Sequence, residues 1–124
     1  MLASNRDKNK YKNICLIDTN AKLAPKIKVS GGAKCNITNE LVSSKNYLGD
    51  RNFVKELLEK FSKDDLLTFL NKNGVFPKIN PKIVKGTYFC DSSQDVIDMF
   101  TKLTTHVKKY LNTTVLDVDF NKQI

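Results

Sequence analysis

The stretch Lys28-Val-Ser-Gly-Gly-Ala-Lys-Cys-Asn-Ile-Thr-Asn39 decides the fold prediction for this chain. It follows a short apolar run that ends in an acid, Ile14-Cys-Leu-Ile-Asp18. In a dinucleotide-binding sheet, an acid at the end of the second strand accepts hydrogen bonds from a ribose hydroxyl. A pair of glycines leaves no Cβ to keep a ligand away, so backbone amides can approach phosphate oxygens. The two features together predict a nucleotide-cofactor site, although the sequence lacks the G-x-G-x-x-G motif that should come first.

The composition is that of one ordinary folded domain. The chain has 124 residues, of which 40% are hydrophobic and 27% are charged, which is enough for a core and usual for a globular protein. No stretch approaches the roughly 18 apolar residues of a membrane span. The N-terminus turns polar after three residues, so we expect neither a membrane partner nor a signal peptide. Three widely spaced cysteines and one histidine do not have the spacing of a zinc site; they indicate reduced thiols in a cytoplasmic protein.

The net charge of +8 is unevenly distributed. Residues 1–39 hold eight Lys/Arg and two acids, a balance of +6, whereas residues 40–124 hold thirteen and eleven, a balance of +2. A basic first third can face RNA or DNA, the phosphates of a dinucleotide, or solvent. Tyr11 is the only aromatic residue before Tyr47, so the stacking platform that bases require is poorly supported. We therefore do not expect nucleic acid as a partner.

The pattern of apolar residues and turn signals predicts an α/β fold. Residues 1–12 look like the last turns of a helix, and residues 14–18 look like a strand buried on both faces. We then expect an extended piece at 27–29, an amphipathic helix at 51–61 and a second helix at 62–73, which starts with a capping box at Ser62 and Asp65. Short strands within 75–90 should follow, then a helix at 95–111. The last element should be a strand at 113–120, with Val115 and Val118 in the core. The two helices of residues 51–73 should pack against each other as a pair.

The chain resembles the aminoacetone-oxidase-like FAD-binding flavoproteins, also called the BaiN/YhiN type. After an acid-ended second strand that family has D-K-L-G-R-K-I-L-I-S-G-G-G-R-C-N-V-T-N. This chain has Ala21-Lys-Leu-Ala-Pro-Lys-Ile-Lys-Val-Ser-Gly-Gly-Ala-Lys-Cys-Asn-Ile-Thr-Asn39. A looser likeness continues through Tyr47-Leu-Gly-Asp50, the two helices and Gly86-Thr-Tyr-Phe89, and covers nearly the whole chain. The resemblance implies an incomplete FAD/NAD(P)-binding Rossmann-like domain (residues 1–39 and 75–124) with an inserted helical pair (residues 51–73).

The chain also departs from that family's pattern. Ala33 stands for the third glycine, Lys34 for an arginine, Ala24-Pro25 for a glycine-arginine, Thr87 for another arginine and Cys90 for a proline. Ala33 is tolerated if its φ is negative, and Lys34 keeps the charge but loses the planar fork of arginine. Members of the family begin with a strand and G-x-G-x-x-G and continue for several hundred further residues. We therefore expect this chain to be a piece that is truncated at both ends.

The resemblance implies a set of cofactor-binding residues. Asp18 would hold the adenosine ribose, and its position at a strand end favours the same role. A backbone cradle along the pyrophosphate and ribityl part of FAD would consist of Ser30, Gly31, Gly32, Ala33 and Lys34. Cys35 would be a small buried residue near the cofactor rather than a redox thiol. The strand at Val115 would pass the adenine, and its main-chain groups would pair with the edge of the base. Asn36 and Thr38 bind flavin or cap the loop, and Lys26 meets phosphate or solvent; these alternatives stay open.

Each of these residues also has an ordinary structural interpretation. Asp18 can be a solvated acid, the glycines a plain turn, and Val115 strand core. We expect His106 to be a surface or hydrogen-bonded helix residue rather than a catalytic base. The sequence contains no Ser/His/Asp arrangement, paired carboxylates or P-loop, so catalysis would belong mostly to the cofactor.

The favoured interpretation is a fragment of an FAD-dependent oxidoreductase that is inactive or binds FAD weakly by itself. The substrate and any use of NAD(P)H cannot be read from the residues. An alternative of another class is a small basic nucleic-acid-binding protein without enzymatic activity, and a third is a decayed reading frame.

Overall fold

The structure is a computed structural model that describes residues 13–81 and 85–119. The chain divides into two compact units, Met1–Pro25 with Phe100–Ile124, and Lys26–Met99. The helix predicted for residues 1–12 lies outside the described residues. Among the helices that are described, none has the length and apolar character needed to cross a membrane.

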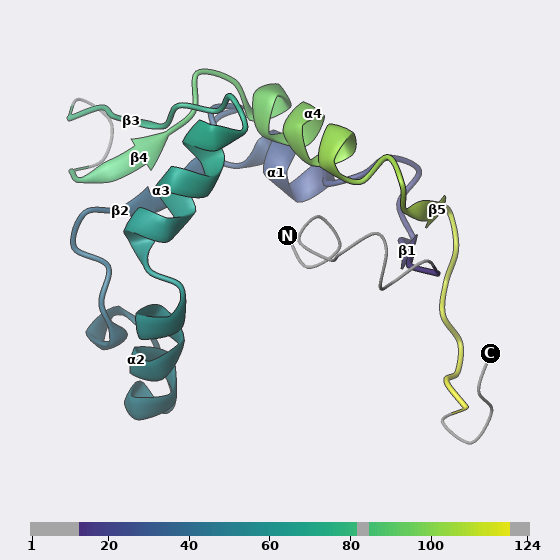
Figure 1. Ribbon diagram of the computed structural model, residues 1–124, viewed down its shortest axis with the longest axis horizontal. Coiled ribbons are helices and arrows are strands. Elements are labelled where there is room, and N and C mark those ends of the chain that lie inside the picture. Colours follow the sequence, from purple (N-terminus) through teal and green to yellow (C-terminus); the bar gives the residue numbers. More distant parts are fainter. Residues whose placement is uncertain (1–12, 82–84, 120–124) are drawn as a thin grey trace. The chain divides into compact units, whose positions relative to one another are not determined.

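The first unit carries a parallel pair of strands, β1 (Cys15–Ile17) and β5 (Lys108–Tyr110) (Figure 1). One further hydrogen bond continues this pairing beyond β1, because the Asp18 amide donates to the Tyr110 carbonyl at 2.9 Å. This pair confirms the predicted α/β class and the strand predicted at 14–18. Burial on both faces is not observed, since Ile17 is 45% exposed. The reason is that, within the described part of the chain, β1 has β5 as its sole neighbouring strand.

The helix predicted at 95–111 is shorter than expected. It is α4 (Ser93–Leu103), and β5 occupies the residues that were expected to form its last turns. The Thr104 hydroxyl donates to the Phe100 carbonyl at 2.7 Å, and the Lys109 ammonium donates to the Thr104 carbonyl at 2.8 Å. These bonds satisfy carbonyls at the helix end, and the β-branched residues that follow favour an extended chain.

The residues that follow α4 also differ from the prediction, because the helix ends early. The strand predicted at 113–120 is wrong over its described part, because residues 113–119 have no regular structure. Val115 and Val118, predicted to be core residues, are 53% and 56% exposed. His106 lies beyond the helix, and both of its ring nitrogens are buried with no hydrogen-bond partner among the described residues. It is therefore not the hydrogen-bonded helix residue that the sequence predicted.

The second unit contains a three-stranded antiparallel sheet within its described residues. The strand order is β2 (Asn36–Asn39), β4 (Thr87–Phe89) and β3 (Lys78–Ile79), and Figure 1 shows β3 and β4 next to each other. Asn36 and Lys78 both pair with Phe89, on its two sides. Strands β3 and β4 confirm the short strands predicted within 75–90, whereas β2 was not predicted.

The buried apolar side chains of the second unit come from segments far apart in the sequence. Leu70 of α3 (Lys63–Lys72) is 2% exposed, Phe89 of β4 is 5% exposed, and Val96 and Met99 of α4 are 3% and 5% exposed. Burying a side chain of this kind stabilises a fold by about 1.5–3 kcal/mol.

The predicted helical pair forms as α2 (Arg51–Lys60) and α3. The capping box is confirmed, because Ser62 Oγ accepts from the Asp65 amide at 3.1 Å and the Asp65 carboxylate accepts from the Ser62 amide at 2.8 Å. The expected packing of the two helices is wrong. α2 contacts the 3₁₀ helix η2 (Ser44–Asn46) instead, and Phe53 stays 59% exposed. Phe61 and Ser62, which link the two helices, both have extended backbone angles.

The extended piece predicted at residues 27–29 is also wrong. These residues lie in a short helix, α1 (Pro25–Val29). Pro25 is its first residue, where the fixed φ of proline favours a helix start and its missing N–H costs nothing. The helix ends directly before the glycine loop, so it positions that loop.

Replacing the N-cap residue of α3 tests this local account. We expect Ser62→Ala to lower the free energy of unfolding by about 1 kcal/mol, because the Asp65 amide loses its acceptor. Urea unfolding followed by circular dichroism measures the change. Thr68→Ala, on the exposed face of the same helix, is the control, and equal effects of the two substitutions would contradict the capping assignment.

Candidate cofactor-binding loop

The loop of residues 30–34 has an unusual run of backbone angles. Gly31, Gly32 and Ala33 have φ values of +58°, +63° and +69°, so three successive residues are left-handed. Cys35 follows at +55°. Left-handed backbone is natural for glycine but strained for other residues. Strain of this kind persists only where the surrounding structure holds it, and it concentrates at binding sites.

The carbonyl groups of the loop are bonded to the rest of the second unit. The Ala33 carbonyl accepts from the Ser93 amide at 2.8 Å, and the Lys34 carbonyl accepts from the Cys90 amide at 2.9 Å. The Ser93 hydroxyl donates to the Lys28 carbonyl at 3.1 Å, and Ser93 is 3% exposed. The sequence interpretation missed Ser93, and the only signal for it was its position in the Ser92-Ser93 start of the helix.

Three amide groups of the loop, unlike most of its carbonyl groups, have no hydrogen bond to the described residues. Within the described part of the chain, the amides of Gly31, Gly32 and Ala33 donate to no protein acceptor. All three residues are exposed. Successive unpartnered amides bind anionic oxygens well, so this backbone presents a set of donors for a ligand.

The two glycines serve this loop in different ways. A Cβ at Gly31 would collide with Oδ1 of Asn36, so a larger residue there would force the Asn36 side chain to move. A Cβ at Gly32 would meet nothing within 4 Å. Gly32 therefore leaves space that a ligand can use to approach the backbone.

Asp18, the acid predicted to hold a ribose, lies directly after β1 in the first unit. Its Oδ1 accepts from the Asn20 amide at 2.8 Å and from the Asn20 side chain at 2.7 Å. These bonds, the backbone one first, lower the pKa of Asp18 below its ordinary value. Asn20 was missed in the sequence interpretation, although an Asp-x-Asn spacing allows this turn. A site shared by Asp18 and the glycine loop remains a prediction.

The cysteines are in two different environments. Cys15 is exposed, whereas Cys35 and Cys90 are 5% and 3% exposed and neighbour each other, with the Cys90 amide 3.4 Å from the Cys35 carbonyl. Burial raises the pKa of Cys35. Burial, followed by electrostatic interactions with Cys35, Asp95 and Asp91, raises the pKa of Cys90 to about 11. Both thiols are protonated at neutral pH and poorly suited to nucleophilic chemistry.

The remaining predicted residues are divided between the two units. Lys34 is exposed at the end of the loop, and Lys26 is exposed on α1. Asn36 and Thr38 lie in β2, where the Asn36 amide donates to the Ser30 hydroxyl at 3.4 Å. Val115 lies in the first unit, in a segment without regular structure.

The whole chain, residues 1–124, matches the family model described as the HI0933-like protein Rossmann domain. This chain belongs to that family. It is also similar to a ribosomal RNA dihydrouridine synthase of Escherichia coli, with 37% identity over 90 residues, which are 71% of this chain and 22% of the relative. A protein of the same name from Haemophilus influenzae is 30% identical over 90 residues, with the same shares of 71% and 22%. The chain thus spans about a fifth of the length of the curated relatives it matches.

The family assignment confirms the resemblance to FAD-binding flavoproteins and the Rossmann-like fold class. FAD is the ligand of this family in general. The glycine loop fits an anionic part of such a cofactor, because it combines unpartnered amides, an open approach at Gly32 and the nearby cation of Lys34.

Ala33 provides a test of the loop conformation. Its φ of +69° does not meet the condition of negative φ under which alanine is tolerated. We expect Ala33→Gly to stabilise the chain by about 0.5–1 kcal/mol, because relief of left-handed strain exceeds the added entropy of the unfolded glycine chain. Chemical denaturation measures the change. Ala21→Gly, at an exposed position without positive φ, should be neutral or destabilising, and a destabilising Ala33→Gly would contradict the assigned conformation.

Asp18 gives a prediction on pH. Its folded pKa is lowered, so its stabilising contribution is present above the unfolded pKa and disappears as the pH falls through the folded pKa. Asn20→Ala should raise the pKa of Asp18 toward its ordinary value without reaching it, since the backbone bond remains. NMR titration of the side-chain carboxyl measures this shift. Asn71→Ala, at an exposed position on α3, should leave the titration of Asp18 unchanged. An Asn20→Ala titration curve that overlays the wild-type curve would refute the contact between Asn20 and Asp18.

Proposed function

We propose that this chain is part of the FAD-binding region of a flavin-dependent oxidoreductase that forms dihydrouridine in ribosomal RNA. The observation that carries the FAD part is the run of three left-handed residues whose amides have no acceptor among the described residues. The family assignment supports FAD as the cofactor. The names of the two relatives support the reaction and the RNA substrate.

The loop residues have defined roles in this proposal. The amides of Gly31, Gly32 and Ala33 donate to oxygens of the pyrophosphate and ribityl part of FAD, with Ser30 at the start of the cradle and Lys34 supplying a positive charge. The Ser30 carbonyl accepts from the Cys35 amide at 3.0 Å and the Gly31 carbonyl accepts from the Lys34 amide at 3.3 Å. Because each peptide unit is planar and trans, these bonds direct the amides of Gly31 and Gly32 the opposite way. Asn36, Thr38 and Lys26 belong to the same proposed contact set.

The first unit supplies the adenosine end in the proposal. Asp18 accepts from a ribose hydroxyl with the oxygen that does not bind Asn20, because both bonds from Asn20 go to Oδ1. The residues around Val115 pair with the adenine through main-chain groups. Asp18 is ionised at neutral pH, as aspartate ordinarily is, and its lowered pKa favours the carboxylate further. It is therefore suited to accept hydrogen bonds and not to donate a proton.

When bound in its reduced form, FAD would supply a hydride to one carbon of a uracil C5–C6 double bond, and the other carbon would take a proton from a general acid or from water. The chain's own contribution is to bind and orient the cofactor. Cys35 and Cys90 remain protonated and buried beside the loop and act as packing, since their raised pKa values disfavour thiolates.

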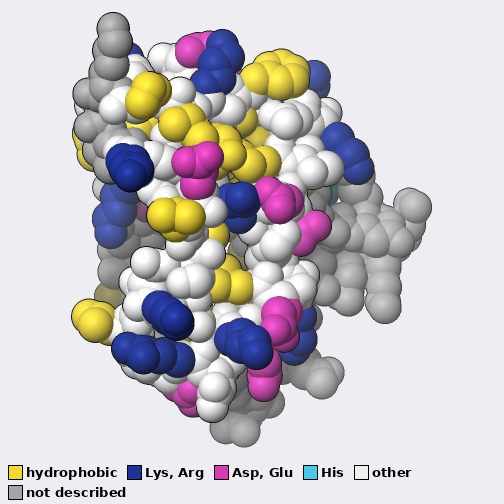
Figure 2. Space-filling model, turned by 90° about the vertical axis from the view of Figure 1, so that its left-hand side faces the viewer, with side chains coloured by type: hydrophobic (Ala, Val, Ile, Leu, Met, Phe, Trp, Pro, Cys, Tyr) yellow, Lys and Arg dark blue, Asp and Glu magenta, His cyan; other side chains and the backbone are white. Residues whose placement is uncertain are grey.

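An RNA substrate differs from the expectation drawn from charge. On the face shown in Figure 2, Lys and Arg side chains stand among Asp and Glu side chains rather than forming one basic stripe. The proposal therefore does not rest on net charge. It rests on the relatives' names, and most of the RNA-binding surface would belong to the part of those proteins that this chain does not span.

The test uses FAD affinity and product formation. We expect the chain extended to the length of its relatives to bind FAD tightly and to form dihydrouridine in ribosomal RNA, measured by mass spectrometry of digested nucleosides. This chain alone should bind FAD much more weakly, because each missing charge-assisted hydrogen bond is worth about 1.5–3 kcal/mol, and about 1.4 kcal/mol is tenfold in affinity.

Two glycine substitutions in the extended protein make this test specific to the loop. Gly32→Ala should reduce FAD affinity at least tenfold, because its methyl group occupies the ligand's approach. Gly74→Ala is the matched control, since both glycines have positive φ, +63° and +82°, and open space around a Cβ. Equal FAD affinity of the two variants would refute the loop assignment, and FAD binding without dihydrouridine formation would refute the substrate.

A further inference from the structure

Cys35 and Cys90 lie opposite each other where the glycine loop enters the sheet of the second unit. Asn36 of β2 pairs with Phe89 of β4 in the antiparallel register, so the two residues immediately outside this pair are Cys35 and Cys90. The Cys90 amide is 3.4 Å from the Cys35 carbonyl, which corresponds to one of the two bonds that antiparallel partners exchange. The sequence showed no partner for the Cys35 thiol, and the sheet supplies one in Cys90.

The separation of such partners suits a disulfide. Directly opposite residues of antiparallel strands have Cα atoms about 4.5–5.5 Å apart, and the Cα atoms of a disulfide are usually about 4.4–6.8 Å apart. Opposite residues also carry their side chains on the same face of a sheet, and both cysteines are buried, at 5% and 3% exposure. Burial is the largest cause of the raised pKa of Cys90 and the Cys35 thiol is the next, as expected for two thiols that are close in space.

The backbone of Cys35 is strained. Its φ of +55° is left-handed, which is unfavourable for a residue with a Cβ. Its amide donates to the Ser30 carbonyl at 3.0 Å and thereby closes the glycine loop. Strain of this kind persists only where the surrounding structure holds it. A covalent link from Cys35 to the end of β4 would hold the chain at the residue that ends the loop.

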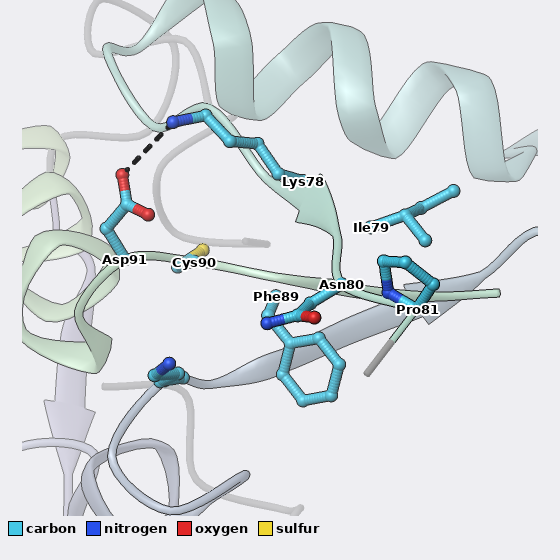
Figure 3. A pocket seen from close by; sticks show the side chains of 8 residues that line it. Lys78, Ile79, Asn80, Pro81, Phe89, Cys90 and Asp91 are labelled. Atoms are coloured by element: carbon cyan, nitrogen blue, oxygen red, sulfur yellow. Dashed lines mark hydrogen bonds and ion pairs between the residues drawn. The ribbon is translucent and has the colours of Figure 1, made fainter. Parts of the chain in front are cut away.

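One thiol of this pair lies beside a pocket at the edge of the sheet. The pocket has a volume of about 240 Å³, and Cys90 is part of its wall together with Phe89 and Asp91. Figure 3 shows the Cys90 side chain at this wall, next to Asp91. The third cysteine of the chain, Cys15, is exposed and belongs to the first unit. The pocket therefore brings a small reagent next to Cys90.

We propose that Cys35 and Cys90 form a reversible disulfide that joins the end of the glycine loop to the end of β4. The oxidant is a small disulfide such as oxidised glutathione. The Cys90 thiol loses its proton to solvent and attacks one sulfur of this reagent, which breaks its S–S bond and releases one glutathione. The Cys35 thiol then loses its proton, attacks the Cys90 sulfur and releases the second glutathione. Two protein thiols are oxidised and one small disulfide is reduced to two thiols, so excess reduced glutathione reverses the reaction.

The experiment measures an equilibrium, because the raised pKa values of both thiols leave few thiolates and make the exchange slow at neutral pH. The full 124-residue chain with Cys15→Ser is incubated with reduced and oxidised glutathione, both folded and unfolded in urea. After acid quenching and alkylation, mass spectrometry counts the chains that lack two hydrogen atoms and carry no alkyl group. We expect the folded chain to keep the disulfide at a [GSH]²/[GSSG] ratio at least tenfold higher than the unfolded chain does, because the fold holds the thiols together. Equal ratios for the folded and unfolded chains would overturn the proposal.

Variants identify the pair. In the chain with all three cysteines, proteolysis without reduction should release a peptide pair that joins Cys35 to Cys90. Cys35→Ala and Cys90→Ala should each abolish the disulfide within the chain, whereas the matched control Cys15→Ser should retain it. A bond from Cys15 to either partner in the folded chain would contradict the assignment. The comparison of folded and unfolded chains uses neither alanine variant, so it still decides the matter if one of them fails to fold.

The effect of the disulfide on the loop is measured on the same samples. Oxidation should raise Tm by on the order of 10 °C and slow hydrogen exchange of the Cys35 amide at least tenfold. The Phe61 amide, which donates to the Leu57 carbonyl at the end of α2, is the reference. If the disulfide forms and the Cys35 amide is slowed no more than the Phe61 amide, the bond does not hold the loop. These measurements use no FAD, so their outcome is independent of the proposed function.

Discussion

The hydrogen bonds that join the glycine loop to the start of α4 and the end of β4 determine what the loop can do. Ser93 and Cys90 donate their amides to the carbonyls of Ala33 and Lys34, and both donors are almost fully buried. A buried donor that loses its acceptor costs about 1–3 kcal/mol. These bonds therefore hold the end of the loop against β4 and α4, while the amides of Gly31, Gly32 and Ala33 have no acceptor among the described residues.

The same hydrogen bonds connect the loop to a pocket of about 240 Å³ at the edge of the sheet, which is lined by residues that include Lys34, Lys78 and Phe89. Lys34 has its carbonyl bonded to the Cys90 amide, and its side chain lines the pocket. Phe89 precedes Cys90 and forms part of the pocket wall. Lys34 therefore belongs both to the loop and to the wall of this pocket.

Sequence predicted the local features of this fold better than the long-range ones. The capping box of Ser62 and Asp65 lies within four residues, and its two hydrogen bonds form as the pattern predicts. The piece at 27–29 was misjudged because a window of alternating apolar residues this short fits a strand or a helix equally well. The helix end near Leu103 depends on bonds from Thr104 and Lys109 that no apolar periodicity records.

In the candidate site, too, the sequence revealed the local features and not the long-range contacts. The glycine pair and the acid after the first strand are local signals, and the sequence singled out both. The proximity of Cys35 and Cys90 was not predictable, because 55 positions separate them and a register of sheet residues brings them together. Ser93 belongs to no motif, so its role emerged only from the structure.

The two left-handed alanines have a consequence for the slow motions of the chain. Ala24, at φ +54°, and Ala33, at +69°, lie on either side of α1, and Ala24 also precedes a proline, which disfavours helical ψ. A helix of five residues cannot sustain itself without its neighbours. Strain at both flanks lowers the free energy of opening this segment relative to the rest of its unit. Amide hydrogens of α1 should therefore exchange with solvent earlier than those of α3, and a ligand seated on the loop should slow them.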